Sequence, residues 1–304
     1  MIWCSGWKLA SAVSNAGGLG LIGAGSMTPE VLEEHIRKCK TFTNKPFGVN
    51  VPLIYSQVDK QFDVIVRERV KIVFTSAGNP ATWTPFLKQN GITVIHVIAS
   101  VKSAIKSEQS GVDGVVAEGF EAGGHNGREE TTTITLIPLI RRATKLPLIA
   151  AGGISTGRSM LAAMILGADG VQIGSRFAAS EESSAHPDFK QKIVSTGDGD
   201  TVLTLKKVIP VRMIRNDFLI KVQQLEDSGA NAEELKQLLG KGRAKLGMFD
   251  GNLEEGELEI GQVAALIDRI MPAGEIVRDI IDELSMAKKE FRNIIFADHN
   301  PKII

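Results

Sequence analysis

Residues 146–177 read LPLIAAGGISTGRSMLAAMILGADGVQIGSRF, and this stretch decides the fold class. It opens with an apolar run that ends in Gly152-Gly153, continues through a helix-like segment at Ser155–Leu166, and closes with a second run, Gly170–Phe177. Neither run alternates between apolar and polar residues, which is typical of parallel strands buried on both faces. The stretch therefore predicts a strand–helix–strand unit of a parallel sheet.

The same unit recurs upstream, at a spacing of roughly 20–35 residues. Helix signals separate the runs: Thr28 before Pro29 marks one helix start, and Ser100–Gln109 forms another helix-like segment. The five further strand candidates are Leu19–Gly25, Pro46–Val51, Ile72–Gly78, Thr93–Ala99 and Gly114–Gly119. The repeat predicts an α/β protein with the architecture of a TIM (β/α)8 barrel.

A closed barrel of this class needs eight strands, and the sequence supplies seven candidates. The segment before the first of them reads as a loop and a helix that ends at Gly17-Gly18. We therefore expect that a first strand, with roughly 10–20 residues, is missing before Met1.

The pattern changes from about Glu181, where the strand series stops. We predict an N-terminally truncated barrel over residues 1–190 and a mostly helical lid subdomain over residues 191–304, whose last helix packs back on the barrel. The helices expected in the second part are 231–247, with Asn231 as its cap, 256–271 and 273–291. Charged residues along these helices are interpreted as solvated faces.

Composition narrows the function classes. The 304 residues carry 35 Lys and Arg against 35 Asp and Glu, which argues against a protein built to hold nucleic acid. No apolar run is long enough for a transmembrane helix, so no membrane partner is expected. Two cysteines exclude a disulfide framework and favour a reducing compartment, so we expect a cytoplasmic protein.

The active site of such a barrel lies in the loops after the carboxyl ends of its strands. If the missing strand counts as the first, the last two glycine turns follow strands seven and eight, where barrels commonly bind phosphate through backbone N–H groups. The candidate phosphate-binding residues are Gly152, Gly153, Gly174 and Ser175.

A second glycine-rich loop, residues 117–127, carries His125. An imidazole beside the pocket can act as acid or base near neutral pH, so His125 is the candidate catalytic residue. His96 lies in an apolar run and is interpreted as a core residue, His186 as a loop cap, and Cys4 as a packing residue. No pair of residues has the spacing of metal ligands, so no catalytic metal is predicted.

The chain resembles the nitronate monooxygenase family, which also contains enoyl-acyl-carrier-protein reductase II. The motifs that carry the resemblance follow the family's order across residues 1 to about 190. They are Met-Ile-Trp at the start, Ala16–Gly20, Pro46–Asn50, Glu121–His125, Ala150–Ile154 and Gln172–Phe177. The resemblance implies a TIM barrel that binds FMN non-covalently under a lid.

The resemblance also implies roles for single residues. Met1 would sit where the family's Gly-Gly-Met turn approaches the flavin ring. Asn50 would hydrogen-bond the flavin or its ribityl chain, and Glu118 would lie near the same groups. His125 would face the substrate beside the ring. The FMN phosphate would be bound by Gly152, Gly153, Gly174 and Ser175.

Two activities compete within the family. An enoyl reductase passes a hydride from NAD(P)H through FMN to an enoyl thioester, whereas a nitronate monooxygenase oxidises alkyl nitronates with oxygen to carbonyl compounds and nitrite. Three segments resemble the reductase branch, which is the interpretation we favour: Glu118–Glu121, Thr131–Leu136 and Glu182–Pro187.

The reductase interpretation makes acyl carrier protein a candidate partner. Because that carrier is acidic, we expect a basic patch near the pocket. Its candidate residues are Lys206, Lys207, Arg212, Arg215 and Lys221. A homodimer is common among such barrels.

Two other classes stay open. One is a flavin-free barrel enzyme that binds a phosphorylated substrate at the same glycine turns. Such an enzyme needs acid–base groups at its strand ends, and this sequence offers Glu118 and His125 there but no lysine. A non-catalytic relic, whose barrel does not close, is the remaining alternative.

Overall fold

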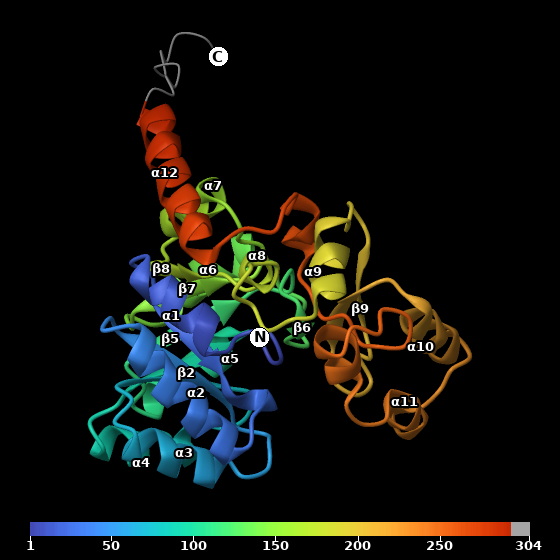
Figure 1. The fold of residues 1–304 in the computed structure, drawn as a ribbon, viewed down its shortest axis with the longest axis horizontal. Helices are drawn as coiled ribbons and strands as arrows, with labels where there is room; N and C mark the ends of the chain where they lie inside the picture. The colour runs from blue at the N-terminus through green and yellow to red at the C-terminus, as the bar shows by residue number, and fades with distance from the viewer. Residues whose placement is uncertain (293–304) are drawn as a thin grey trace, which may run out of the picture.

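The seven predicted apolar runs form one parallel sheet in the computed structural model, which describes residues 1–292. The order of neighbouring strands is β1-β2-β3-β4-β5-β7-β8, and every neighbouring pair is parallel. The strands are β1 (Gly20–Gly23), β2 (Phe47–Pro52), β3 (Ile72–Ser76), β4 (Thr93–Ile98), β5 (Gly114–Glu118), β7 (Leu148–Ala151) and β8 (Gly170–Gln172). Because all seven run the same way, their carboxyl ends meet at one edge of the curled sheet (Figure 1).

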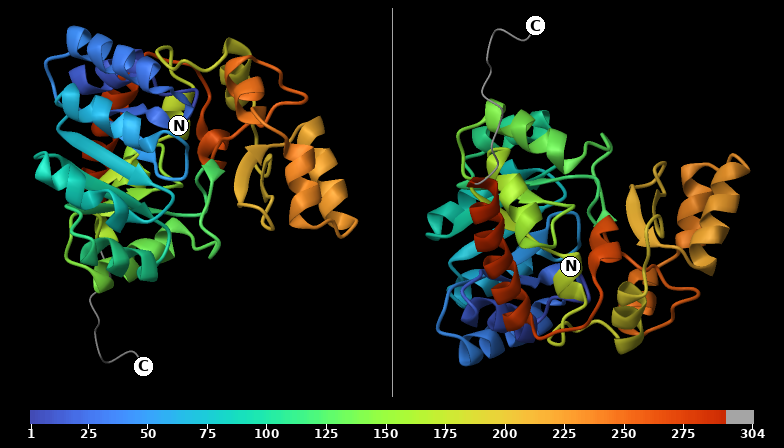
Figure 2. Two further views of the ribbon diagram at one scale, coloured as in Figure 1. Left: turned by 90° about the horizontal axis from the view of Figure 1, so that it is seen from below. Right: turned by 90° about the horizontal axis from the view of Figure 1, so that it is seen from above.

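Helices follow the strands and cover the outside of the sheet (Figure 2). Thr28 caps α2 by accepting a hydrogen bond from the Val31 N–H, as the sequence predicts, and Ser100 caps α5. The helices of the barrel are α1 (Trp7–Asn15), α2 (Pro29–Phe42), α3 (Val58–Arg67), α4 (Thr84–Gln89), α5 (Val101–Gln109), α6 (Thr133–Ala143), α7 (Gly157–Ile165) and α8 (Ser175–Ala178). Two short 3-10 turns, η1 (Ala24–Ser26) and η2 (Pro80–Thr82), complete this part.

The sheet ends at β1 and β8, and no strand lies between them within residues 1–292. Helix α1 precedes β1 and packs closely on it, since a Cβ at Gly20 would lie 1.9 Å from the carbonyl oxygen of Ala10. The fold is therefore the α/β barrel that the sequence predicts, with seven strands.

Two apolar layers hold the barrel together. The outer layer lies between the sheet and its helices and includes Ile22, Phe62 and Ile137, all fully buried. The inner layer fills the barrel interior with Phe74, Val116 and neighbouring side chains. Burying one such large apolar side chain stabilises a fold by about 1.5–3 kcal/mol. The two layers therefore stabilise the sheet whose strand ends form one edge of the barrel.

The chain leaves the barrel at Ser180 and returns at Met271, where these two residues form an isolated parallel bridge. The segment between them is the lid, which lies beside the barrel in Figure 1. Its elements are α9 (Pro187–Val194), β9 (Thr201–Thr204), β10 (Val211–Ile214), α10 (Asp217–Asp227), α11 (Ala232–Leu239), the π-helical η3 (Lys245–Phe249) and the 3-10 helix η4 (Gln262–Leu266). The lid is mostly helical, and it contains two short strands that the sequence does not predict.

For two of the lid helices, the predicted residue ranges differ from those in the structure. The helix predicted over 231–247 begins after Asn231, which caps it, but ends at Leu239 because Gly240 adopts a φ of +63°. The helix predicted over 256–271 is not formed, apart from η4. Its first half is extended instead, because it runs along β10, where the Ile214 N–H donates to the Leu258 carbonyl oxygen at 2.9 Å.

Helix α12 (Ala273–Arg292) follows the lid and packs against α7 and α1. The α7–α12 contact is backbone to backbone, since a Cβ at Gly157 would lie 2.1 Å from the Leu284 nitrogen. The Gly157 N–H also donates to a carboxylate oxygen of Glu283 at 2.7 Å. No helix among the described residues is long and apolar enough to cross a membrane.

Candidate functional site

Three neighbouring strand ends place side chains next to one another at the carboxyl edge of the sheet. Glu118, the last residue of β5, lies opposite Ala151 of β7, and Ala151 lies opposite Gln172 of β8. Asn50 lies at the same edge, near the end of β2, where its amide donates to the Ser76 hydroxyl at 3.4 Å. The sequence-predicted residues Asn50 and Glu118 therefore share one edge with the glycine turns.

The turn after β7 requires glycine at two positions. Gly152 has a φ of +85°, and a Cβ there would lie 2.6 Å from the carbonyl oxygen of Gly119. Gly153 follows with a φ of +67°. Both conformations are costly for residues with a side chain, so the backbone alone faces the site at this turn.

The turn after β8 is more open. A Cβ at Gly174 would meet only the Met1 side chain, at 3.7 Å. Met1 is 42% exposed and lies beside both Gly174 and the end of β1, where its carbonyl oxygen is 2.7 Å from a Cβ placed on Gly23. Met1 is thus at the same edge as Asn50 and Glu118.

Two buried polar atoms at this edge have no hydrogen-bond partner within the described residues. They are the hydroxyl oxygen of Ser155, in the loop after β7, and the side-chain carbonyl oxygen of Gln172, at the end of β8. Leaving a buried polar group unpaired costs about 1–3 kcal/mol, so each atom indicates a polar ligand at this edge. The sequence did not single out either residue.

Ser175 has a partner in the lid. Its hydroxyl oxygen accepts a hydrogen bond from the Gly261 N–H at 2.9 Å. The neighbouring Gln262 N–H donates to the carbonyl oxygen of Glu121, in the loop after β5. The start of η4 therefore holds the loops after β5 and β8 together.

Glu118 is the first titratable group of the site. Burial raises its pKa to about 7, and its carboxylate makes no hydrogen bond within residues 1–292. A narrow hollow beside it, which does not admit a water-sized sphere, is lined by Ala99, Glu118, Phe120, Gly127, Glu129, Glu130 and Thr131. A buried carboxyl that titrates near neutral pH at a strand end is typical of a functional site.

His125 lies on a separate short strand, β6 (Gly124–His125), and is exposed. Strand β6 pairs antiparallel with β10 of the lid, with His125 opposite Val211 and Gly124 opposite Arg212. Together β6, β10 and β9 form a three-stranded sheet. The imidazole therefore stands where the barrel meets the lid.

Arg212 secures this junction. Its guanidinium lies 4.9 Å from the centre of the Phe120 ring and donates to the Phe120 carbonyl oxygen at 3.1 Å. The side chain is 2% exposed, and burial lowers its pKa. Arg212 is thus a structural link and does not contribute to the expected basic patch.

The lid brings two further carboxyl groups to this region, Glu257 and Glu259. Burial raises the pKa of both, that of Glu257 to about 8, and mutual repulsion adds to the shift of Glu257. The positive charge of His125 acts on Glu259 in the opposite direction. Both residues fall in the segment predicted as a solvated helix, although the alternation Glu257-Leu258-Glu259-Ile260 is a strand signal.

The remaining candidates have structural partners. His96 is buried and hydrogen-bonded to the Thr75 hydroxyl at 2.7 Å, and His186 caps α9. Cys4 is buried, and burial raises its pKa to about 11, which suits packing better than nucleophilic attack. Glu121 caps α6, because its carboxylate accepts from the Thr133 N–H at 3.0 Å. In residues 1–292 no group of three His, Cys, Asp or Glu side chains could hold a metal ion.

The chain matches the family model described as nitronate monooxygenase over residues 1–57 and 52–283. It superimposes on the structure of FabK from Thermotoga maritima with a TM-score of 0.92 and 42% identity, covering 97% of this chain and 94% of that one. A nitroalkane oxidase from Streptomyces ansochromogenes gives a TM-score of 0.81 at 26% identity, covering 95% of each chain.

Two curated relatives of similar identity carry different descriptions. A probable nitronate monooxygenase of Staphylococcus saprophyticus is 32% identical over 91% of this chain and 90% of its own length. The (3aS,4S,5R,7aS)-5-hydroxy-7a-methyl-1-oxo-octahydro-1H-indene-4-carboxyl-CoA dehydrogenase of Rhodococcus jostii is also 32% identical, over 92% and 90%.

The barrel, its lid and these similarities define an FMN-dependent oxidoreductase. The chain belongs to the nitronate monooxygenase family. The residues present fit FMN: the glycine turn at Gly152-Gly153 could present backbone N–H groups to a phosphate, and the side-chain oxygens of Ser155 and Gln172 that lack partners within residues 1–292 could bind a polar ligand.

Proposed function

We propose that this protein binds FMN at the carboxyl edge of the barrel and uses NAD(P)H to reduce the carbon–carbon double bond of an enoyl thioester. The similarity to FabK supports the enoyl-acyl-carrier-protein reductase interpretation. The relative named as a carboxyl-CoA dehydrogenase supports a thioester as the substrate class. Family membership argues against the flavin-free alternative.

In this proposal, different residues at the carboxyl edge of the sheet bind different parts of FMN. Asn50 and Gln172 would bind the ring or ribityl chain, with Met1 and Glu118 alongside. FMN, when bound, supplies hydride transfer between the nicotinamide and the substrate. The residues proposed to bind its phosphate are Gly152, Gly153, Ser155, Gly174 and Ser175.

The observation that carries the choice of substrate is the degree of similarity to the two solved structures. The chain is 42% identical to FabK, with a TM-score of 0.92. It is 26% identical to the nitroalkane oxidase, with a TM-score of 0.81. The stronger similarity supports an enoyl thioester as the substrate.

His125 is the proposed acid. Hydride delivery to the β-carbon leaves negative charge on the α-carbon and the thioester oxygen, and protonation of the α-carbon completes the reduction. The exposed imidazole at the barrel–lid junction can donate that proton, because histidine is a common general acid in enzymes.

Nitronate oxidation is the second candidate. It is supported by the curated relatives named as probable nitronate monooxygenases and by the nitroalkane oxidase structure. In that reaction His125 would orient the nitronate. The raised pKa values of Glu118, Glu257 and Glu259 favour their protonated forms, which do not repel an anion.

Acyl carrier protein is a narrower proposal than the thioester itself. Of the expected basic patch, Lys206 forms an ion pair with Glu130, Lys221 pairs with Glu255, and the Lys207 ammonium donates to the Ala230 carbonyl oxygen. These pairings weaken the patch, since an exposed ion pair presents little net charge. A comparison of kcat/KM for the same acyl group on CoA and on the carrier protein would test the carrier.

The function is tested by anaerobic flavin reduction. The FMN-loaded protein would be mixed separately with NADH, NADPH and propyl nitronate while the flavin absorbance is followed. Bleaching by NAD(P)H, with reoxidation by crotonyl-CoA, is the expected result. Bleaching by nitronate alone, followed by nitrite release in air, would replace the reductase proposal with the second candidate.

A further inference from the structure

His125 follows two glycines that the packing of the lid requires. A Cβ at Gly123 would lie 2.3 Å from the carbonyl carbon of Ile260, and Gly124 has a φ of +77°. Two consecutive glycines leave the backbone free to adopt many conformations, so they do not by themselves fix the residue that follows. The imidazole therefore depends on other residues for its position.

The side chain of Asn126 restrains this backbone from the residue after His125. Its amide nitrogen donates to the carbonyl oxygen of Ala122 at 2.8 Å and to that of Gly124 at 3.1 Å, on either side of Gly123. Asn126 is 9% exposed, so these hydrogen bonds are shielded from water. A side-chain amide carries two hydrogens and can serve both carbonyl oxygens, whereas an alanine offers no donor. Asn126 thus closes the glycine turn.

The backbone of Asn126 joins the same loop to the lid. Strand β6 pairs with β10 so that His125 lies opposite Val211. The Asn126 N–H then donates to the Pro210 carbonyl oxygen at 2.9 Å, which continues the same register beyond both strands. Successive side chains of a paired segment point to opposite faces, in agreement with the exposed His125 and the buried Asn126. The imidazole and the amide that closes the turn therefore lie on opposite sides of one backbone.

Arg128 fastens this segment two residues further on. Its guanidinium donates to the carbonyl oxygens of Lys206 at 3.0 Å and Val208 at 2.9 Å, in the turn between β9 and β10. The Glu130 carboxylate forms an ion pair with the Lys206 ammonium at 2.5 Å. Val208 and Lys206 are the residues that the register of β6 and β10 places opposite Arg128 and Glu130. The pairing with the lid therefore extends well beyond the two residues of β6.

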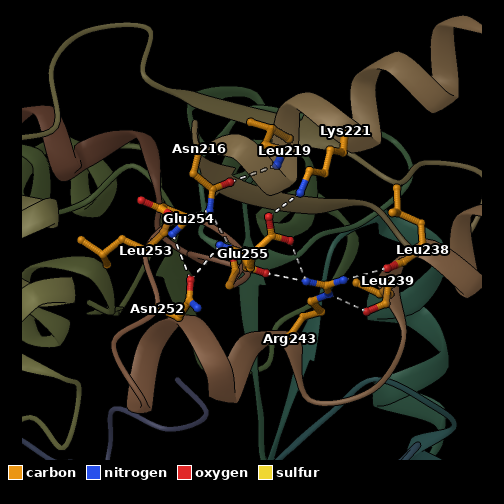
Figure 3. A network of polar contacts seen from close by, with 11 residues as sticks. Asn216, Leu219, Lys221, Leu238, Leu239, Arg243, Asn252, Leu253, Glu254 and Glu255 are labelled. Atoms are coloured by element: carbon orange, nitrogen blue, oxygen red, sulfur yellow. Dashed lines mark hydrogen bonds and ion pairs between the residues drawn. The ribbon is translucent and has the colours of Figure 1, made fainter.

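Residues 124–130 and 206–212 together form a junction ribbon, which is also anchored within the lid. The amide of Asn216, just after β10, donates to the carbonyl oxygens of Leu253 and Gly256 at 2.8 Å each (Figure 3). The oxygen of the same side chain caps α10. The lid end of the ribbon is therefore held in place by hydrogen bonds, and the barrel loop is aligned against it.

We propose that Asn126 and Arg128 are positioning residues for His125. Asn126 sets the shape of the glycine turn before the imidazole, and Arg128 holds the segment after it against the turn between β9 and β10. The proposal rests on the proposed reductase function, in which His125 protonates the substrate. Both residues act through the imidazole.

The test measures two half-reactions of the FMN-loaded full chain in Asn126→Ala and Arg128→Ala. Flavin reduction by NAD(P)H should keep the wild-type rate, because this step does not use His125. Flavin reoxidation by crotonyl-CoA should slow about 10- to 100-fold in Asn126→Ala, since misplacing a catalytic group by about 1 Å can cost 10²-fold. The KM for crotonyl-CoA should change less than about twofold, because the substrate contacts remain. Equal slowing of both half-reactions would indicate general damage and overturn the proposal.

Arg128→Ala keeps the test open if Asn126→Ala does not fold, because Arg128 is exposed. It should slow reoxidation by about two- to tenfold, the equivalent of one hydrogen bond. A wild-type rate of reoxidation in Arg128→Ala would contradict its part in the proposal.

A double-mutant cycle separates positioning from a direct contribution. In a His125→Ala protein, the added change Asn126→Ala should alter the reoxidation rate less than about twofold, because the group that Asn126 positions is already gone. Losses that add in full would overturn the positioning role.

Asn90→Ala and Arg67→Ala are the matched controls and should behave as the wild type. Both side chains are exposed, and each makes a similar bond away from the junction ribbon. The Asn90 amide donates to the Phe86 carbonyl oxygen at 2.9 Å, and the Arg67 guanidinium donates to the Glu33 carboxylate at 2.8 Å.

Hydrogen exchange tests the junction ribbon without a measurement of activity. In the protein without FMN, the amides of residues 120–131 and 206–212 should exchange faster in Asn126→Ala and Arg128→Ala than in the wild type and the controls. Unchanged exchange in both variants would overturn the restraint on the loop, even if thioester reduction is observed. A wild-type protein that reduces no thioester would refute the proposed function, whereas faster exchange in the two variants would still support the restraint.

Discussion

The backbone N–H of Gly261 donates to the hydroxyl oxygen of Ser175 across 2.9 Å, which joins the lid to the loop after β8. Ser175 is also a proposed ligand of the FMN phosphate, so one side chain would serve both the lid and the cofactor. A hydroxyl can do this, because it accepts from the lid and donates to a phosphate oxygen.

Replacing Ser175 by Ala should therefore weaken FMN binding about 10- to 150-fold, since a hydrogen bond to a charged group contributes roughly 1.5–3 kcal/mol. It should also speed amide hydrogen exchange at residues 259–262. Fluorescence titration of FMN and hydrogen-exchange mass spectrometry measure the two effects. Ser195→Ala is the control, because the Ser195 hydroxyl is exposed and bonds only within α9 and its cap. Unchanged FMN affinity would contradict the phosphate assignment.

Gly152→Ala should destabilise the protein by about 1–3 kcal/mol, because the new Cβ would lie 2.6 Å from a carbonyl oxygen at a φ of +85°. Thermal unfolding without FMN measures this loss. Gly170→Ala is the matched control, since a Cβ there has nothing within 4 Å and the residue does not have a positive φ. Equal melting temperatures for the two variants would refute the steric requirement at Gly152.

Glu257→Gln should make stability less dependent on pH. The carboxyl has a pKa of about 8 in the folded protein against an ordinary value of 4.5, so the folded state binds more protons than the unfolded state between these values. The wild type therefore loses stability as pH rises from about 5 to 8, whereas the glutamine variant lacks this loss.

The melting temperature of Glu257→Gln relative to the wild type should consequently rise from pH 5 to pH 8 and level off above it. Each kcal/mol would appear as a change of roughly 1.5–2 °C in a protein of 304 residues, because the entropy of unfolding grows with chain length. Glu254→Gln provides the baseline at every pH, because Glu254 is an exposed carboxyl three residues away in the same lid. A constant difference across this range would show that Glu257 ionises normally.

His125→Ala should reduce turnover of the enoyl thioester by about 10²–10⁴-fold, the usual contribution of a general acid. The FMN content should stay at the wild-type level, because the imidazole is exposed on β6 and lies outside the glycine turns. Single-turnover kinetics and the flavin absorbance of the purified variant report the two quantities. Loss of FMN with little loss of turnover per bound flavin would show that His125 serves the cofactor.

The barrel was predictable because parallel strands leave a simple signal. The run Leu148–Ala151, for example, is apolar throughout and ends in two alanines, since the strand is buried and a tight turn follows. The helix starts at Thr28 and Ser100 were predictable because their side chains satisfy N–H groups within the same few residues.

The barrel–lid junction was harder to predict, because its contacts join residues far apart in the sequence. Strand β6 has two residues, and only its pairing with β10, which is more than eighty residues downstream, makes it a strand. Glu257 and Glu259 were assigned to a solvated helix, since charge near an apolar run is usually exposed. Ser155 and Gln172 could be identified only from the structure, because each has a buried side-chain oxygen without a hydrogen-bond partner within residues 1–292.

The bridge between Ser180 and Met271 places the two ends of the lid side by side on the barrel. Insertions whose ends are adjacent are readily tolerated by a host domain. The order of the seven parallel strands therefore does not depend on the length of the lid, because the chain re-enters the barrel beside the point where it left. Changes within the lid alter the cover of the carboxyl edge while the strands that form this edge keep their connections.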